Sequence, residues 1–94
     1  MNAPAPRFDR REKADAYAGE IFRLGRSRVA VCRDGVQWLL QRRRSGGGGA
    51  AGPRWESRGY FLTRAALVRL WRAETGDDGE ALLALLPVRF ERAD

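Results

Sequence analysis

The clearest pattern in the chain is an alternation of apolar and polar residues over positions 28–42, interrupted by Asp34-Gly35. Alternation with a period of two is typical of half-buried β-strands, and an Asp-Gly pair between two such runs favours a type I′ hairpin. A two-residue loop sets the register so that Val31 pairs with Trp38. This register gathers five apolar side chains on one face, which we expect to be the core layer: Val29, Val31, Val36, Trp38 and Leu40.

The opposite face of the same hairpin is mostly polar and cationic. It carries Arg26, Arg28, Ala30, Cys32, Gln37, Leu39, Gln41 and Arg43. Because successive side chains of a strand point to opposite sides, a buried apolar face leaves this second face outward. We therefore expect the polar face to be exposed to solvent.

Two further segments complete the predicted core. Residues 54–62 form an extended run that returns antiparallel to the second hairpin strand. Thr63 is placed to cap a helix over 64–74, in which Ala66, Leu67, Leu70 and Trp71 fall on one face at helical spacing. This amphipathic helix should pack across the sheet.

The ends of the chain carry weaker patterns. Asp9 can cap a peripheral helix that runs to about Ala18, and residues 20–24 are either the last turn of that helix or a short strand. Residues 80–86 predict a short leucine-rich helix that ends before Pro87. The predicted fold is thus α+β, a three-stranded antiparallel sheet packed by one helix, with short peripheral helices at the N- and C-terminal ends.

The domain organisation is simple, since 94 residues are about one small domain. Residues 1–8 lack periodicity and predict a flexible arm, and residues 9–94 form the single domain. Within that domain, residues 45–53 are a glycine-rich loop without helix or strand chemistry.

Charge is distributed unevenly along the chain, whose formal net charge is +6. Residues 1–22 are balanced, residues 23–72 hold twelve arginines against two carboxylates, and residues 73–94 carry a net charge of −4. A positive field over one part of a fold favours polyanions or acidic protein surfaces as partners.

Composition excludes several classes of function. The chain has no histidine and a single cysteine, Cys32, so histidine-dependent hydrolase triads, zinc sites and internal disulfides are ruled out. No pair of carboxylates and no nucleophile with a base can be drawn, so we expect no enzyme, no cofactor and no metal. Apolar stretches are only a few residues long, which indicates a cytoplasmic protein without a membrane partner.

The remaining chemistry points to nucleic acid, with DNA favoured over RNA. Arginine reads guanine edges, glutamine reads adenine edges, and further arginines hold phosphates. The candidate contact residues are Arg26, Arg28, Gln37, Gln41, Arg42, Arg43, Arg44, Arg54, Trp55 and Arg58. The run 42–44 is either a phosphate clamp or a solvated strand end.

Residues 55–67 carry a family resemblance through Trp55, Gly59, Phe61, Thr63 and Ala66. In these residues the segment resembles the third strand and the start of the helix in AP2 DNA-binding domains and in the related arm-binding domains of tyrosine integrases. The resemblance covers about half of the chain and implies a three-stranded sheet that enters the major groove. The chain also resembles small uncharacterised proteins encoded with mobile elements of high-GC bacteria.

An alternative interpretation keeps the same fold with another partner. Trp38 and Trp71 lie on apolar faces and should be core residues, whereas Trp55 either closes the edge of the core or stacks on a ligand. In a protein-interaction module that docks on an acidic host surface, Trp55, Arg58 and Tyr60 would be the anchors, because Trp, Tyr and Arg dominate interface hot spots. The oligomeric state is left open by the sequence.

Overall fold

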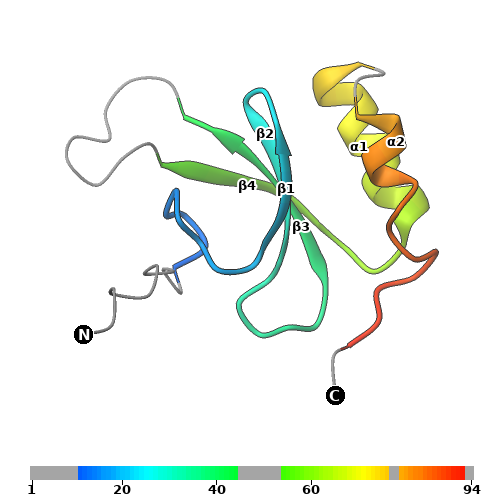
Figure 1. The fold of residues 1–94 in the computed structure, drawn as a ribbon, viewed down its shortest axis with the longest axis horizontal. Helices are drawn as coiled ribbons and strands as arrows, with labels where there is room; N and C mark the ends of the chain where they lie inside the picture. The colour runs from blue at the N-terminus through cyan, green and yellow to red at the C-terminus, as the bar shows by residue number, and fades with distance from the viewer. Residues whose placement is uncertain (1–10, 45–53, 77–78, 93–94) are drawn as a thin grey trace, which may run out of the picture.

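Four strands form one antiparallel sheet in the order β1-β2-β3-β4, and two helices follow them (Figure 1). The computed structural model describes residues 11–44, 54–76 and 79–92. The predicted arm at 1–8 and the predicted loop at 45–53 lie outside these residues. The strands are β1 (Glu20–Leu24), β2 (Ser27–Val31), β3 (Trp38–Arg43) and β4 (Trp55–Phe61), and the helices are α1 (Arg64–Thr75) and α2 (Glu80–Leu83).

The fold is α+β, as expected, but the sheet has four strands and not three. The additional strand is β1, one of the two alternatives that the pattern left open for residues 20–24. It pairs antiparallel with β2 through the two-residue connection Gly25-Arg26, and Gly25 has a φ of 60°. A positive φ is easily adopted by glycine, which allows this tight turn.

The predicted register of β2 and β3 is confirmed, since Val31 pairs with Trp38 and Val29 with Leu40. The predicted type I′ turn is wrong. The Gly35 N–H donates to the Cys32 carbonyl at 2.9 Å, and only Gly35 in this loop has a positive φ, whereas type I′ needs positive φ at both central residues. The loop is consequently longer than two residues and leaves Val36 exposed, outside the core.

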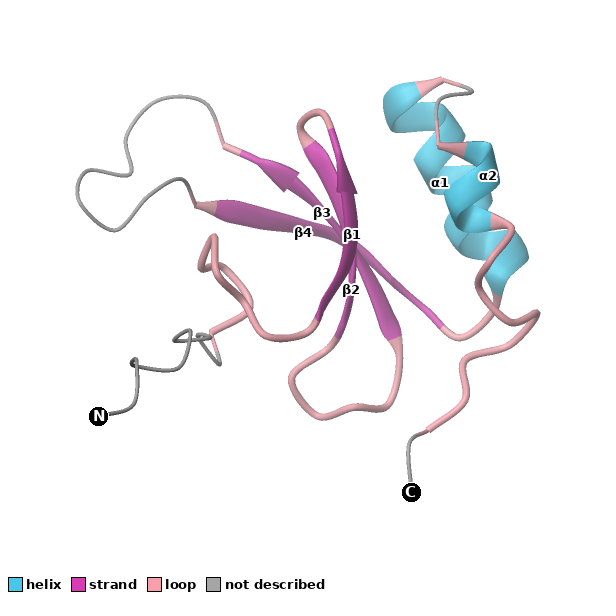
Figure 2. Ribbon diagram, viewed as in Figure 1, coloured by secondary structure: helices cyan, strands magenta, loops and turns pink. Residues whose placement is uncertain are grey.

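One face of the sheet packs against the helices, which lie together on one side of it (Figure 2). The buried core there consists of Val29, Trp38, Leu40, Leu67, Trp71, Leu83 and Leu86. The Thr63 side chain accepts a hydrogen bond from the Ala66 N–H, which confirms the predicted cap of α1. The C-terminal helix α2 is shorter than predicted.

The other face of the sheet is covered as well, and this overturns the expected exposed polar face. Residues 11–19, which we call the strap, cross it in a series of turns rather than in the predicted N-terminal helix. Tyr17 of the strap packs with Ala30, Cys32 and Leu39 in a second buried cluster between the strap and the sheet. The strap is joined to the sheet at both ends, because the Trp55 N–H donates to the Lys13 carbonyl and the Val31 N–H to the Gly19 carbonyl.

Among the residues that the structure describes, no helix is long and apolar enough to cross a membrane.

Candidate nucleic-acid interface

Arg28 occupies the centre of the face beneath the strap and is fully buried. Its guanidinium has five N–H donors, and all five find acceptors. Nε donates to the Gln41 side chain at 2.7 Å, and the terminal nitrogens donate to the Glu20 carboxylate at 3.1 Å and to strap carbonyls. Those carbonyls belong to Glu12, Ala14 and Asp15. Arg28 and Gln41 are therefore structural in this conformation and cannot reach base edges.

Trp55 lies in the same cluster, with 1% of its surface exposed. Its indole N–H donates to the Asp15 carboxylate at 3.0 Å, and the guanidinium carbons of Arg28 and Arg23 lie 4.3 and 5.0 Å from the ring centroid. Of the two alternatives for Trp55, the structure shows the buried one. Trp55 is thus excluded as an accessible anchor for either kind of partner.

The charges of this cluster balance one another. Arg23 forms ion pairs with Asp15 at 3.0 Å and with Glu20 at 2.8 Å, and Arg28 also pairs with Glu20. The indole hydrogen bond from Trp55, helped by Arg23, holds the pKa of Asp15 below its usual value against the opposing effect of burial. Two cations and two carboxylates thus form a neutral unit, which is not an anion-binding site.

Burial also raises the pKa of the nearby Tyr17 hydroxyl to about 12. This hydroxyl donates to the Val31 carbonyl at 2.7 Å and helps to hold the strap in place.

Five exposed cations lie instead at one end of the sheet. The Arg43 N–H donates to the Arg26 carbonyl at 2.7 Å, and the Arg44 N–H donates to the Arg54 carbonyl at 2.9 Å. These bonds bring the β1–β2 turn, the end of β3 and the start of β4 side by side. The side chains of Arg26, Arg43, Arg44 and Arg54 are exposed there, and the strap adds exposed Lys13. We call these five residues the basic end.

The other predicted contact residues lie elsewhere. Arg42 is partly buried on the helix side of β3 and donates to the Glu74 carbonyl at 3.3 Å. Arg58 forms ion pairs with Glu74 at 2.9 Å and Glu56 at 3.3 Å. Gln37 belongs to the β2–β3 loop at the opposite end of the sheet. The run 42–44 is therefore divided, with Arg42 directed to α1 and the next two arginines in the basic end.

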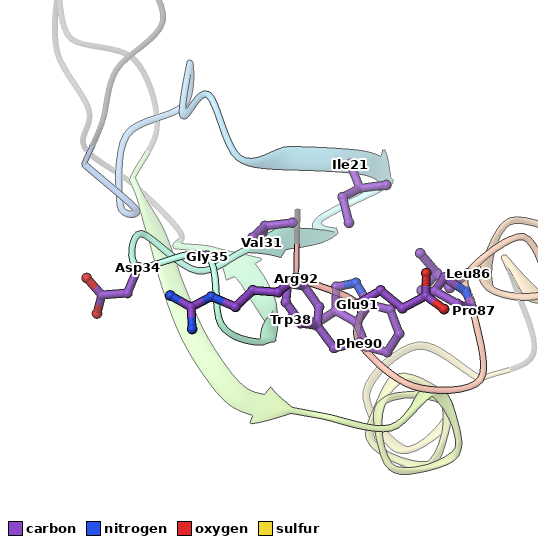
Figure 3. Close-up of a pocket in the computed structure, with 10 residues that line it drawn as sticks. All are labelled: Ile21, Val31, Asp34, Gly35, Trp38, Leu86, Pro87, Phe90, Glu91 and Arg92. Atoms are coloured by element: carbon purple, nitrogen blue, oxygen red, sulfur yellow. The ribbon is translucent and has the colours of Figure 1, made fainter. Parts of the chain in front are cut away.

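Two hollows are relevant to binding. A groove of about 540 Å³ follows β4 next to the strap, between Tyr60 and the arginines of the basic end. A second hollow of about 460 Å³ lies near the C-terminal segment (Figure 3). Its lining includes the rings of Trp38 and Phe90, whose centroids are 5.4 Å apart. In the described parts of the chain, no three metal-ligating side chains cluster around either hollow.

The sequence did not predict the strap or the burial of Arg28 beneath it. The polar hairpin face also carries Ala30, Cys32 and Leu39, and these small or apolar residues are a sign of a strand buried on both sides. The carboxylates of Asp15 and Glu20, just upstream of β2, were the available signal for a buried cation.

No known protein family matches this chain, and no curated protein or solved structure was found to match it.

Proposed function

We propose that this protein is a non-catalytic nucleic-acid-binding module that holds phosphates with its basic end. The observation that carries the proposal is the convergence of Arg26, Arg43, Arg44 and Arg54, which two inter-strand hydrogen bonds bring to one end of the sheet. Clustered cations raise the local positive potential. This potential attracts a polyanion such as nucleic acid, whose phosphates follow one another along the backbone.

Carboxylates lie near this end of the sheet: Glu12 and Glu56 line one groove with Lys13, Arg44 and Arg54, and Glu74 lines another hollow with Arg26. Glu12 accepts a hydrogen bond from the Arg33 backbone N–H at 2.6 Å, and Glu56 pairs with Arg58. No ion pair joins either carboxylate to Lys13, Arg44 or Arg54 among the described residues. These three side chains are therefore available to phosphates.

The mode of binding differs from the one that the hairpin pattern suggested. Arg28 and Gln41, the residues suited to reading bases in the major groove, are fully buried. Phosphate contacts fix position and supply affinity, but they carry no sequence information directly. We therefore expect binding that depends weakly on sequence and strongly on salt, with DNA as the first ligand and RNA as the second.

The test is a salt titration of binding to a labelled DNA of mixed sequence. The logarithm of the association constant should fall linearly with the logarithm of salt concentration, with a slope of about −0.9 for each phosphate contact in a duplex. Combined replacement of Arg43, Arg44 and Arg54 with Ala should reduce the steepness of that slope by roughly two to three.

The matched control replaces Arg69, Arg89 and Arg92 with Ala. These arginines are also exposed, but they lie on α1 and the C-terminal segment. Both triple variants lose the same charge, so a binding loss confined to the first places the contact at the basic end. Equal losses in both, or no binding by the unaltered protein at about 50 mM salt, would refute the proposal.

A further inference from the structure

The groove beside β4 joins the basic end to an exposed aromatic ring. Its volume is about 540 Å³, and its lining includes the cations Lys13, Arg44 and Arg54, the ring of Tyr60, and the carboxylates of Glu12 and Glu56. The cations outnumber the carboxylates by one, and Glu56 is paired with Arg58. We propose that this groove binds a single-stranded polynucleotide, with a base stacked on Tyr60 and phosphates held by the three cations. This inference rests on the proposed function and specifies the kind of nucleic acid.

Tyr60 is suited to stacking because its ring is half exposed. Its exposed fraction is 51%, and it is the only exposed large aromatic residue in the part of the chain that the structure describes. Tyr60 pairs with Leu39 across β3 and β4, so its side chain stands on the strap side of the sheet. Aromatic rings on such a strand face provide a platform for unpaired bases.

The cations are spaced along the same groove. Arg44 and Arg54 are joined by a backbone hydrogen bond at its far end, and Lys13 approaches from the strap through its carbonyl bond to the Trp55 N–H. Arg54 and Tyr60 are six residues apart, about 20 Å of extended strand. The backbone of a few nucleotides can span this distance, with its phosphates at the cations and one base turned toward the Tyr60 ring.

A single strand fits this arrangement better than a duplex. In a duplex the base faces are covered by the neighbouring base pairs, so a ring at the groove wall can stack on a base only after the duplex is opened. An unpaired base presents its face directly. The combination of cations with one exposed ring therefore favours a single strand.

The experiment compares binding of a labelled oligothymidine, a uridine oligomer of equal length and a DNA duplex at fixed salt. Tyr60→Ala should weaken binding of the single strands by roughly 5- to 150-fold, the range expected for one lost base stack, and leave duplex binding nearly unchanged. Tyr60→Phe keeps the ring and should bind like the parent. A fluorescent base analogue in the oligomer should change its emission with the parent and not with Tyr60→Ala.

The control is Leu62→Ala, which truncates another exposed apolar side chain, outside the groove lining. Thermal melting of each variant verifies that it is folded. This inference is overturned if the parent protein binds single strands and duplex with equal affinity, or if Tyr60→Ala binds single strands as tightly as the parent. In either case the proposed function still holds as long as binding depends on salt. Absence of binding to all three ligands overturns both. The oligothymidine and uridine arms distinguish DNA from RNA as the source of the strand.

Discussion

At the residue scale, the decisive feature is an arginine that is buried with all of its donors satisfied. A buried charge is tolerated only when it is paired and hydrogen-bonded. Arg28 meets this condition with the Glu20 carboxylate, the Gln41 amide and three strap carbonyls. Backbone carbonyls have no sequence signature, which is why alternation alone could not show that this residue turns inward onto a covered face.

Arg28→Met should lower the free energy of unfolding by roughly 3–5 kcal/mol, because three strap carbonyls and the Gln41 amide oxygen lose their donor and the Glu20 carboxylate keeps only its ion pair with Arg23. Arg28→Lys should also be destabilising, since three ammonium donors cannot replace a planar group with five. Urea unfolding measures both variants. Arg33→Met, at an exposed position, is the control, and an Arg28→Met protein as stable as this control would contradict the assigned role.

Asp15 predicts a loss of stability in acid. Its pKa lies below the ordinary value of 3.8 in the folded protein, chiefly because the Trp55 indole N–H stabilises the carboxylate. The folded state therefore binds a proton less readily than the unfolded state. The stabilisation is present above the ordinary pKa and is lost as pH falls through the lowered one.

Melting temperatures of the parent protein and Asp15→Asn, measured from about pH 6 to about pH 2.5, test this expectation. The parent should lose more stability than Asp15→Asn below about pH 4, because the amide does not titrate. Asp34→Asn, at an exposed carboxylate on the β2–β3 loop, is the matched control. Parallel curves for the parent and Asp15→Asn would show that the indole contact does not affect stability.

At the scale of elements, the sequence predicted the register of the hairpin even though it predicted the wrong turn. Val29, Trp38 and Leu40 are buried almost completely against the helices, so a slip by one residue would turn apolar side chains of the slipped strand away from this core and toward the strap. The burial of these side chains determines the pairing, and the loop adapts to it. Helix α1 was predicted well because its cap and its apolar face are both encoded in adjacent residues. Residues 20–24 could not be assigned from their own sequence, because they form a strand only by pairing with β2.

Gly35→Val should accordingly destabilise the protein without changing the register. Gly35 has a φ of 70°, and no atom lies within 4 Å of where a Cβ would stand, so the cost is conformational rather than steric. We expect a loss of about 1–2 kcal/mol for Gly35→Val and a smaller loss for Gly35→Asn, because asparagine tolerates this region. Thermal melting measures the loss, and cross-strand nuclear Overhauser effects between Val29 and Leu40 report the register. A changed register in Gly35→Val would mean that the turn controls the pairing.

At the scale of the whole molecule, the protein has three layers, with the strap, the sheet and the helices stacked in that order (Figure 1). The charge of residues 23–72 is not all available on the surface, because Asp15 and Glu20 from the preceding segment neutralise Arg23 and Arg28. Charge arithmetic along the chain could predict an excess of cations, but it could not predict which ones tertiary contacts would neutralise. Four of the ten predicted contact residues therefore meet at the basic end, while the others are buried, paired with α1 or located on a distant loop.

The hydrogen bond between Arg44 and Arg54 also has a consequence for evolution and for protein engineering. The β3–β4 ladder is already closed at these two residues, and two residues would suffice to connect strands so joined. The chain uses nine, and doubling the length of a connection costs only about 0.6 kcal/mol in closure entropy. Selection on stability thus constrains the length of this connection very little. Descendants of this sequence can lengthen or shorten it, and a designer can graft a peptide or a second domain there, at the border of the basic end.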